Sequence, residues 1–478
     1  MEPRLARAVL PAILVLSAAC GGPEADSGPL PANGRPVVLI SIDSLRADHC
    51  TPYGYQPEFS EEPTTPFLDR MAREGVLFEN AQSSTSWTLP AHASLLTGMD
   101  CLQHGVRNRE HSLDPETELL AGRFRRAGYA TGGFYSAPFL APIWGFFRGF
   151  DRYLAASPYL ASVAEVVTDE DPKALLQAHE ASHQDARCSE RVVDAALDWL
   201  EEEERWKGPF FLFLHLWDPH YDYQPPEDYA RRFQREGGRL EFLRFMESDW
   251  PREILPEVRA LYDAEIRYTD DQIARLFARL EEWGIADRVI FAVTSDHGDE
   301  FFEHEQKGHQ KTLFQEVTHI PMVVRAPGLV APGLRQGATV ALYDLAPTLL
   351  DLAGVPPWEG RRGRSLAAWA QEAERPDLAV LLDLHMHFAR GAHWSGVVEG
   401  RNKFLWDEDR SRGLLFDLGR DPGERRPQRL ESPDAAEFSR YAWSLLEEAR
   451  RARPYAPAPA LSPEMENTLA QLGYTEGE

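Results

Sequence analysis

The chain contains the stretch Ser86-Trp87-Thr88-Leu89-Pro90-Ala91-His92-Ala93-Ser94-Leu95-Leu96-Thr97-Gly98. Pro90 is favoured in the first turn of a helix, where its missing N–H needs no partner. We therefore expect Thr88 at or just before a helix N-terminus, where free N–H groups and the positive end of the helix dipole attract anions. A hydroxyl beside an anion site is what nucleophilic attack on a phosphate or sulfate ester requires, although a simple cap on a core helix is the alternative.

On either side of this stretch, three short apolar runs predict buried strands, and each run ends in polar side chains that can bind a metal. The runs are residues 37–42, 210–216 and 289–294, and they are followed by Asp43, by Asp218 and His220, and by Asp296 and His297. Helical patterns over residues 67–74, 192–200 and 262–280 alternate with these strands, and 320–324 is a fourth apolar run. This alternation predicts an α/β fold with a doubly wound, mostly parallel sheet, in which ligands bind beyond the carboxyl ends of the strands.

The composition fits an ordinary globular protein and restricts its partners. The chain has 478 residues, 43% hydrophobic content and a formal net charge of −26. Such a charge disfavours binding to nucleic acid or to an anionic membrane surface. An acidic protein that handles an anionic ester must therefore concentrate positive charge locally, through a metal or through clustered basic side chains.

The N-terminus has the pattern of an export signal. Arg4 and Arg7 precede an apolar run over residues 8–19, and Cys20 follows directly. This pattern predicts a lipoprotein-type signal peptide at 1–19 and a lipid on Cys20 at a bacterial envelope membrane. The alternatives are a plain cleaved signal, giving a periplasmic or secreted protein, and a retained anchor. Membrane contact is expected only through this anchor.

The remaining boundaries follow from changes in composition. A tether is predicted at 20–35, a main domain at 36–365, a small C-terminal α+β subdomain at 366–455 and a tail at 456–478. Cys50, Cys101 and Cys188 allow one disulfide, but the sequence does not choose the pair.

The candidate site combines residues from the opening stretch and from the strand ends. Asp43, Asp296, His297 and Thr88 would hold one divalent metal, with Mn²⁺ or Zn²⁺ favoured by the imidazole and Ca²⁺ or Mg²⁺ possible. Metal coordination would activate the Thr88 hydroxyl as a nucleophile.

Further polar residues are candidates for contact with the substrate. Lys311, His220 and His309 would bind the anion or protonate the leaving group. His92 and Arg46 are candidate substrate-binding residues, although His92 could be a core histidine and Arg46 could simply pair with an acid.

Seven motifs in order resemble the sulfatase family of the alkaline phosphatase superfamily, at residues 42–49, 88–98, 295–299, 308–313, 319–321, 344–348 and 416–424. The resemblance implies an alkaline-phosphatase-like core with a small C-terminal subdomain. It implies that Asp43, Asp296 and His297 are metal ligands, that Thr88 stands at the nucleophile and that Lys311 contacts the substrate anion.

The chain also departs from the family pattern. The family oxidises Cys or Ser in C/S-x-P-x-R to formylglycine, whereas this chain has Thr88 and His92 at the first and last positions. The resemblance then implies direct attack by Thr88 without formylglycine, on a phosphate ester and more specifically a phosphodiester, by a hydrolase or transferase. The alternatives are a sulfatase acting on an anionic glycan or a small sulfate ester, and a non-catalytic module that binds anions.

Overall fold

The computed structural model describes residues 32–156, 188–235, 245, 250–386, 392–430, 432–451 and 456–457. The predicted signal peptide, most of the tether and nearly all of the C-terminal tail lie outside the described residues. Within this part of the chain, no helix is both long and apolar enough to cross a bilayer.

The core of the fold is a nine-stranded sheet with the order β10-β2-β11-β7-β1-β6-β4-β5, and β12 pairs with β2. Its strands are β1 (Val37–Ile42), β2 (Val76–Gln82), β4 (Ala130–Tyr135), β5 (Arg152–Ala155), β6 (Phe210–Leu216), β7 (Ile290–Ser295), β10 (His319–Ile320), β11 (Met322–Arg325) and β12 (Leu334–Ala341). The predicted strands at 37–42, 210–216 and 289–294 are β1, β6 and β7, which are adjacent and parallel.

Helices cover both faces of the sheet, as the alternation of strands and helices predicted. Along β1, Val37 and Leu39 face one apolar core, while Val38, Ile40 and Ile42 face the other. The first face is covered by α2 (Thr88–Thr97), α4 (Leu120–Arg126) and α10 (Leu345–Leu352), and the second by α1 (Pro66–Glu74), α6 (Cys188–Glu201) and α8 (Leu255–Glu282). The doubly wound α/β architecture is therefore confirmed. Short helices α3 (Cys101–His104), α7 (Glu227–Phe233) and α9 (Gln315–Thr318) lie in the connections.

The fourth apolar run differs from a plain parallel strand. Residues 320–324 are divided between β10 and β11, and Pro321 separates the two. Proline lacks the N–H that a strand ladder needs, which explains the break. Both pieces are antiparallel to their neighbours, β10 to β2 and β11 to β2 and β7. The sheet is thus mostly parallel with an antiparallel insertion.

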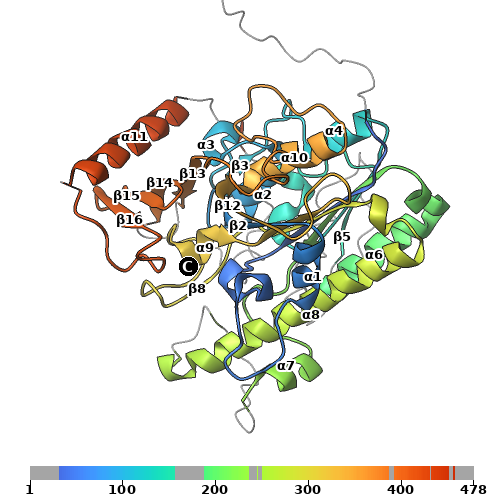
Figure 1. Cartoon of the computed structure of the whole chain (residues 1–478), viewed down its shortest axis with the longest axis horizontal. Helices are drawn as coiled ribbons and strands as arrows, with labels where there is room; N and C mark the ends of the chain where they lie inside the picture. The colour runs from blue at the N-terminus through green and yellow to red at the C-terminus, as the bar shows by residue number, and fades with distance from the viewer. Residues whose placement is uncertain are drawn as a thin grey trace, which may run out of the picture.

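A second, antiparallel sheet forms the C-terminal subdomain beside the main sheet (Figure 1). It consists of β13 (Val380–His385), β14 (His393–Glu399), β15 (Asn402–Asp407) and β16 (Arg412–Asp417), and α11 (Pro433–Arg450) packs against it. Two small ladders pair β3 (His111–Ser112) with β17 (Ala456–Pro457) and β8 (Glu300–Phe301) with β9 (Lys307–Gly308).

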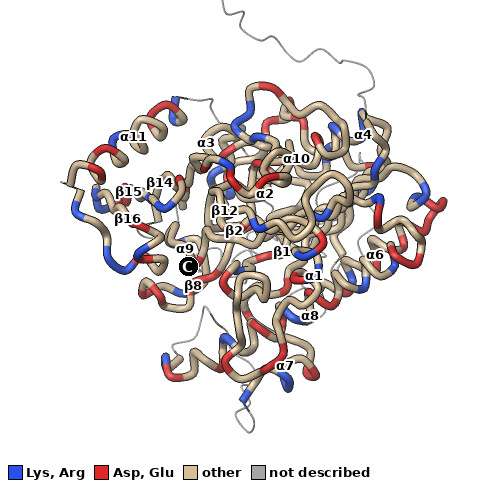
Figure 2. Tube along the Cα trace, viewed as in Figure 1, with Lys and Arg blue, Asp and Glu red and all other residues tan. Residues whose placement is uncertain are grey.

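The helices carry charges of both signs, and the three described cysteines are reduced. Acidic and basic residues interleave along α6, α8 and α11 (Figure 2). Cys50, Cys101 and Cys188 are buried free thiols, so the disulfide that the sequence allowed is not formed between them.

Candidate active site

Three neighbouring strands bring the predicted metal ligands to one edge of the sheet. β1 lies between β7 and β6, and Ile42 is level with Ser295 on one side and Leu216 on the other. The residues that follow these strands therefore meet, and Asp43, Asp296 and His297 are all fully buried. Their ligand atoms lie within 4.8 Å of one another.

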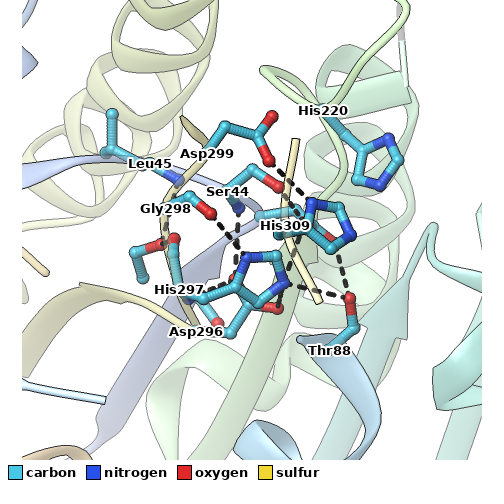
Figure 3. A network of polar contacts seen from close by, with 12 residues as sticks. Ser44, Leu45, Thr88, His220, Asp296, His297, Gly298, Asp299 and His309 are labelled. Atoms are coloured by element: carbon cyan, nitrogen blue, oxygen red, sulfur yellow. Dashed lines mark hydrogen bonds and ion pairs between the residues drawn. The ribbon is translucent and has the colours of Figure 1, made fainter. Parts of the chain in front are cut away.

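Thr88 begins helix α2, as the sequence predicted, and its hydroxyl faces this cluster (Figure 3). Its Oγ1 lies 3.4 Å from Asp43 Oδ2 and 3.4 Å from His297 Nε2. The site therefore combines a hydroxyl, two carboxylates and an imidazole at the N-terminal end of a helix.

The donor set fits a divalent cation. Asp296 Oδ2 is buried and accepts no hydrogen bond from the described residues. It lies 3.4 Å from His297 Nε2, the same spacing that separates Thr88 Oγ1 from its two neighbours. Two ligands about 2.1 Å from a tetrahedral ion lie roughly 3.4 Å apart, whereas a hydrogen bond would be near 2.9 Å. These spacings would suit atoms that coordinate a shared ion.

The two carboxylates also need a cation for electrostatic reasons. Burial and the charge of Asp43 raise the pKa of Asp296 to about 7. Burial also disfavours charge on Asp43, but contact with His215 and the charges of His220 and His297 leave its pKa lowered. Without a metal, the pair thus keeps one carboxylate ionised and holds the other close to its protonated form. A divalent cation held by the two carboxylates would replace that proton.

His92 lies under Thr88 and is fully buried. Its Nδ1 is 2.8 Å from the carbonyl oxygen of Thr88, which can only accept, so Nδ1 carries the proton. Nε2 then accepts from Ser41 Oγ at 3.0 Å. Burial and the nearby His215 lower the pKa of His92 well below its usual value. The structure thus favours the core-histidine alternative, in which a neutral His92 ties the first turn of α2 to β1.

His215 is a site residue that the sequence reasoning missed. It occupies the sixth position of β6 and is fully buried, and its Nε2 lies 3.2 Å from Asp43 Oδ2. With His92 and Asp296 it forms a second group of potential metal-binding atoms within 4.8 Å. A single polar residue near the carboxyl end of an apolar strand was the available signal.

His309 and Asp299 form a second polar layer above the candidate metal ligands (Figure 3). His309 Nδ1 contacts Asp299 Oδ1 at 2.7 Å, and Tyr223 donates to Asp299 Oδ2 at 2.8 Å. The His309 ring lies 4.4 Å from the His297 ring and 5.1 Å from the His220 ring, measured between centroids. Burial is the main cause that lowers the pKa of His309, and burial lowers that of His220 to about 4. His309 therefore lies beside the candidate ligand His297, and His220 lies beside His309.

The two predicted cationic residues have partners of their own. Arg46 forms two hydrogen bonds with Asp48, at 2.9 and 2.8 Å, and one with Glu303 at 2.8 Å. It also donates to the Asp299 carbonyl oxygen at 3.0 Å, so pairing with acids is the role that the structure displays for Arg46. Lys311 donates to the Lys307 carbonyl oxygen at 2.8 Å.

Comparison with known proteins identifies the family. The sequence model of the sulfatase family matches residues 35–355, and that of the C-terminal region of N-sulphoglucosamine sulphohydrolase matches 304–451. An arylsulfatase of Clostridium perfringens is 26% identical over 442 residues, which cover 81% of this chain and 89% of the relative.

Solved structures agree on the fold. A phosphonate monoester hydrolase of Agrobacterium radiobacter superposes with a TM-score of 0.69 at 22% identity, over 87% of this chain and 95% of that one. A protein solved with its substrate D-glucosamine-2-N,6-O-disulfate has a TM-score of 0.66 at 19% identity, over 87% of this chain and 98% of that one. With the family model matching about two thirds of its length, the chain belongs to the sulfatase family of the alkaline phosphatase superfamily and is a hydrolase of sulfate or phosphate esters.

Proposed function

We propose that the protein hydrolyses phosphate esters, with phosphodiesters preferred, by direct attack of Thr88 and without formylglycine. The observation that carries the proposal is the position of Thr88 Oγ1, 3.4 Å from both Asp43 Oδ2 and His297 Nε2. A divalent cation held by Asp43, Asp296 and His297 would lower the pKa of the hydroxyl and neutralise the substrate anion. The two imidazoles, His297 and the nearby His215, favour Zn²⁺ or Mn²⁺ over Ca²⁺ or Mg²⁺.

The side chains of the site can carry out both steps of a substitution at phosphorus. Thr88 releases its proton to water, and its Oγ1 bonds to phosphorus while the bond from phosphorus to the leaving oxygen breaks. His309 or His220 gives the leaving oxygen a proton. Water then cleaves the phosphothreonine and restores the hydroxyl of Thr88.

The side chain of Thr88 excludes formylglycine, and the charge of the site favours a phosphodiester over a phosphomonoester. Oxidation of the secondary alcohol of Thr88 would give a ketone, so the aldehyde of formylglycine cannot form from it. Among the described candidates for contact with the anion, Lys311 is the cation that remains, because His92 is neutral and Arg46 is engaged by Asp48 and Glu303. A site with little positive charge besides its metal suits a singly charged diester better than a doubly charged monoester.

Sulfate ester hydrolysis is the second candidate, because the 26% identical relative is an arylsulfatase. A sulfate ester is also singly charged, so the argument from charge does not separate it from a phosphodiester. The non-catalytic alternative is not retained, because the buried donor set and the family membership describe a hydrolase.

Matched substrates decide between the candidates. Full-length protein loaded with Zn²⁺ or Mn²⁺ would be assayed on bis(4-nitrophenyl) phosphate, 4-nitrophenyl phosphate and 4-nitrophenyl sulfate. We expect the diester to react fastest, Thr88→Ala to lose the activity and Thr88→Ser to keep part of it. Mass analysis after a rapid acid quench should find phosphate on Thr88. A clear preference for the sulfate, or full activity of Thr88→Ala, would contradict the proposal.

We further propose that the protein is exported and held at a bacterial envelope membrane through lipid on Cys20. The support is the sequence of residues 1–20, with Arg4 and Arg7 before an apolar run. Cys20→Ser should move the protein from the membrane fraction to the soluble fraction. Unchanged membrane association would contradict the lipid anchor.

A further inference from the structure

The residues between Asp299 and the end of α9 form a segment that carries His309 and Lys311. This His309 segment, residues 299–318, runs through the β8–β9 hairpin and returns to the main sheet through α9. His309 is buried against Asp299, which starts the same segment. The position of His309 thus depends on what fixes the hairpin and α9.

Glu424 of the C-terminal subdomain holds the α9 end of this segment. Its Oε2 accepts a hydrogen bond from the backbone N–H of Gln315, the first residue of α9, at 2.5 Å. Lys403 on β15 approaches Glu424 Oε1 at 3.0 Å and also donates to Thr318 Oγ1 at 3.2 Å. The side chains of Lys403 and Glu424 are both fully buried.

Glu424 also holds the hairpin end, through its main chain. The carbonyl oxygen of Glu424 lies 3.1 Å from His304 Nε2, and His304 Nδ1 lies 2.5 Å from Glu316 Oε1. A carbonyl can only accept, so Nε2 donates, and the His304 ring stacks on Phe314 with centroids 3.6 Å apart. One residue of the C-terminal subdomain therefore contacts both ends of the stretch that contains His309.

A buried ion pair of this kind adds little to the net stability of the fold. Removing two charges from water costs about as much as their attraction returns, so well-packed apolar side chains would stabilise an interface at least as well. Such a pair does fix the relative position of the two segments that carry it, because each charged atom must lie against its partner. A second ion pair, Arg107–Asp383, joins the same two parts of the chain at 2.6 and 2.7 Å but does not involve the His309 segment.

We propose that Glu424 and Lys403 are positioning residues that hold the His309 segment, and so keep His309 in place beside the metal ligands and Thr88. Glu424 ends the motif at residues 416–424, and this motif would thus contribute to catalysis by positioning His309. The inference rests on the proposed function only in the role that it gives to His309.

The test compares three variants of the full-length, metal-loaded protein. Glu424→Gln removes the charge but keeps an acceptor for the Gln315 N–H. Because this variant leaves Lys403 buried without a counter-charge, a double variant, Glu424→Gln with Lys403→Met, removes both charges. Asp383→Asn is the control, since it breaks the other ion pair between the same two parts.

The kinetic readout is the ratio of kcat for an activated aryl ester to kcat for an alkyl ester of the same acid. An alkyl leaving group needs protonation more than 4-nitrophenol does, so a displaced His309 changes this ratio. We expect the Glu424 single and double variants to lower kcat for the alkyl ester by roughly tenfold or more, with a smaller loss for the aryl ester. Asp383→Asn should leave the ratio within about twofold of the parent, a factor too small for loss of a general acid.

A structural readout keeps the test independent of the reaction. Amide hydrogen exchange across residues 299–318 should accelerate in both Glu424 variants and stay unchanged in Asp383→Asn. If the enzyme proves to cleave sulfate esters, the ratio is measured with aryl and alkyl sulfates. If it cleaves neither class of ester, the proposed function fails while the exchange comparison still decides the positioning role.

The double variant separates positioning from stability. It should recover the melting temperature lost in Glu424→Gln without recovering kcat for the alkyl ester. Recovery of that kcat together with stability, or equal changes of ratio and exchange in Asp383→Asn, would overturn the proposal.

Discussion

His309 donates a hydrogen bond from Nδ1 to Asp299 Oδ1 at 2.7 Å, beside the rings of His297 and His220. The donor assignment follows because the hydrogen bond and charge of His309 hold the pKa of Asp299 below its usual value against the effect of burial, so Asp299 is ionised. Nδ1 therefore keeps its proton, and exchange with a substrate takes place at Nε2.

Asp299→Asn should weaken proton donation by His309. Burial lowers the pKa of His309 and the Asp299 charge opposes that change, so its removal lowers the pKa further. We expect the alkaline limb of the rate profile for alkyl esters to move to lower pH, with a loss of roughly ten- to a hundredfold at neutral pH. Rate profiles for alkyl and activated aryl esters check this. An equal loss for both at all pH values would contradict the role of His309 as an acid.

His92→Ala should destabilise the protein without removing its metal. The change leaves a cavity and deprives Ser41 Oγ and the Thr88 carbonyl oxygen of their partner, at a cost of roughly 2–4 kcal/mol. Urea unfolding measures the loss, and His92→Gln, whose amide can still donate to that carbonyl, should lose less. Metal analysis distinguishes the roles, because a folded His92→Ala protein without metal would make His92 a ligand.

Chelation of the metal should lower the stability of the parent protein much more than it lowers the stability of the Asp296→Asn variant. A ligand at a hundred times its dissociation constant stabilises the folded state by about 2.7 kcal/mol. We expect chelated protein to unfold at lower urea concentration and Zn²⁺ or Mn²⁺ to restore the parent but not Asp296→Asn. Thr88→Ala, which keeps the two carboxylates and His297, serves as the matched control. Equal restoration of Asp296→Asn would place the metal elsewhere.

Glu300 should make the protein less stable as pH rises. Burial, aided by the charge of Glu316, raises its pKa to about 8 from an ordinary value near 4.5, so the folded state keeps a proton that the unfolded state releases. This contribution to the free energy of unfolding is fully present below about pH 4.5. It falls by on the order of 3–5 kcal/mol as the pH rises from there to about 8. The difference in unfolding free energy between the parent and Glu300→Gln, measured at several pH values, should show this slope. A constant difference would mean that Glu300 has the same pKa in the folded and unfolded states, which would contradict the raised pKa.

Those parts of the fold and site that depend on local pattern were predictable. Apolar runs of strand length ending in Asp43 and Asp296 gave the central strands, and Pro90 placed Thr88 at a helix start. The contact of His215 with Asp43 was not predictable, because a histidine inside an apolar run is expected to be a core residue. Only the pairing of β1 with β6 brings His215 to Asp43.

Long-range partners were the other limit. Arg46 was an open choice in the sequence, because Glu303 lies more than 250 positions away and only folding brings them to 2.8 Å. The antiparallel direction of β11 was likewise invisible, since an apolar run carries no information about the direction of its neighbours.

The order of the central strands has a consequence for how the protein acquires its metal. Asp43 and Asp296 become neighbours only when β7 has paired with β1, and Thr88 joins them only when α2 has packed against the sheet, so no fragment that lacks one of these elements presents the ligand set. Metal uptake should therefore follow assembly of β1, β7 and α2, and the bound ion should report global unfolding rather than local fraying. Loss of metal from a variant is then a measure of its folded fraction as much as of its chemistry.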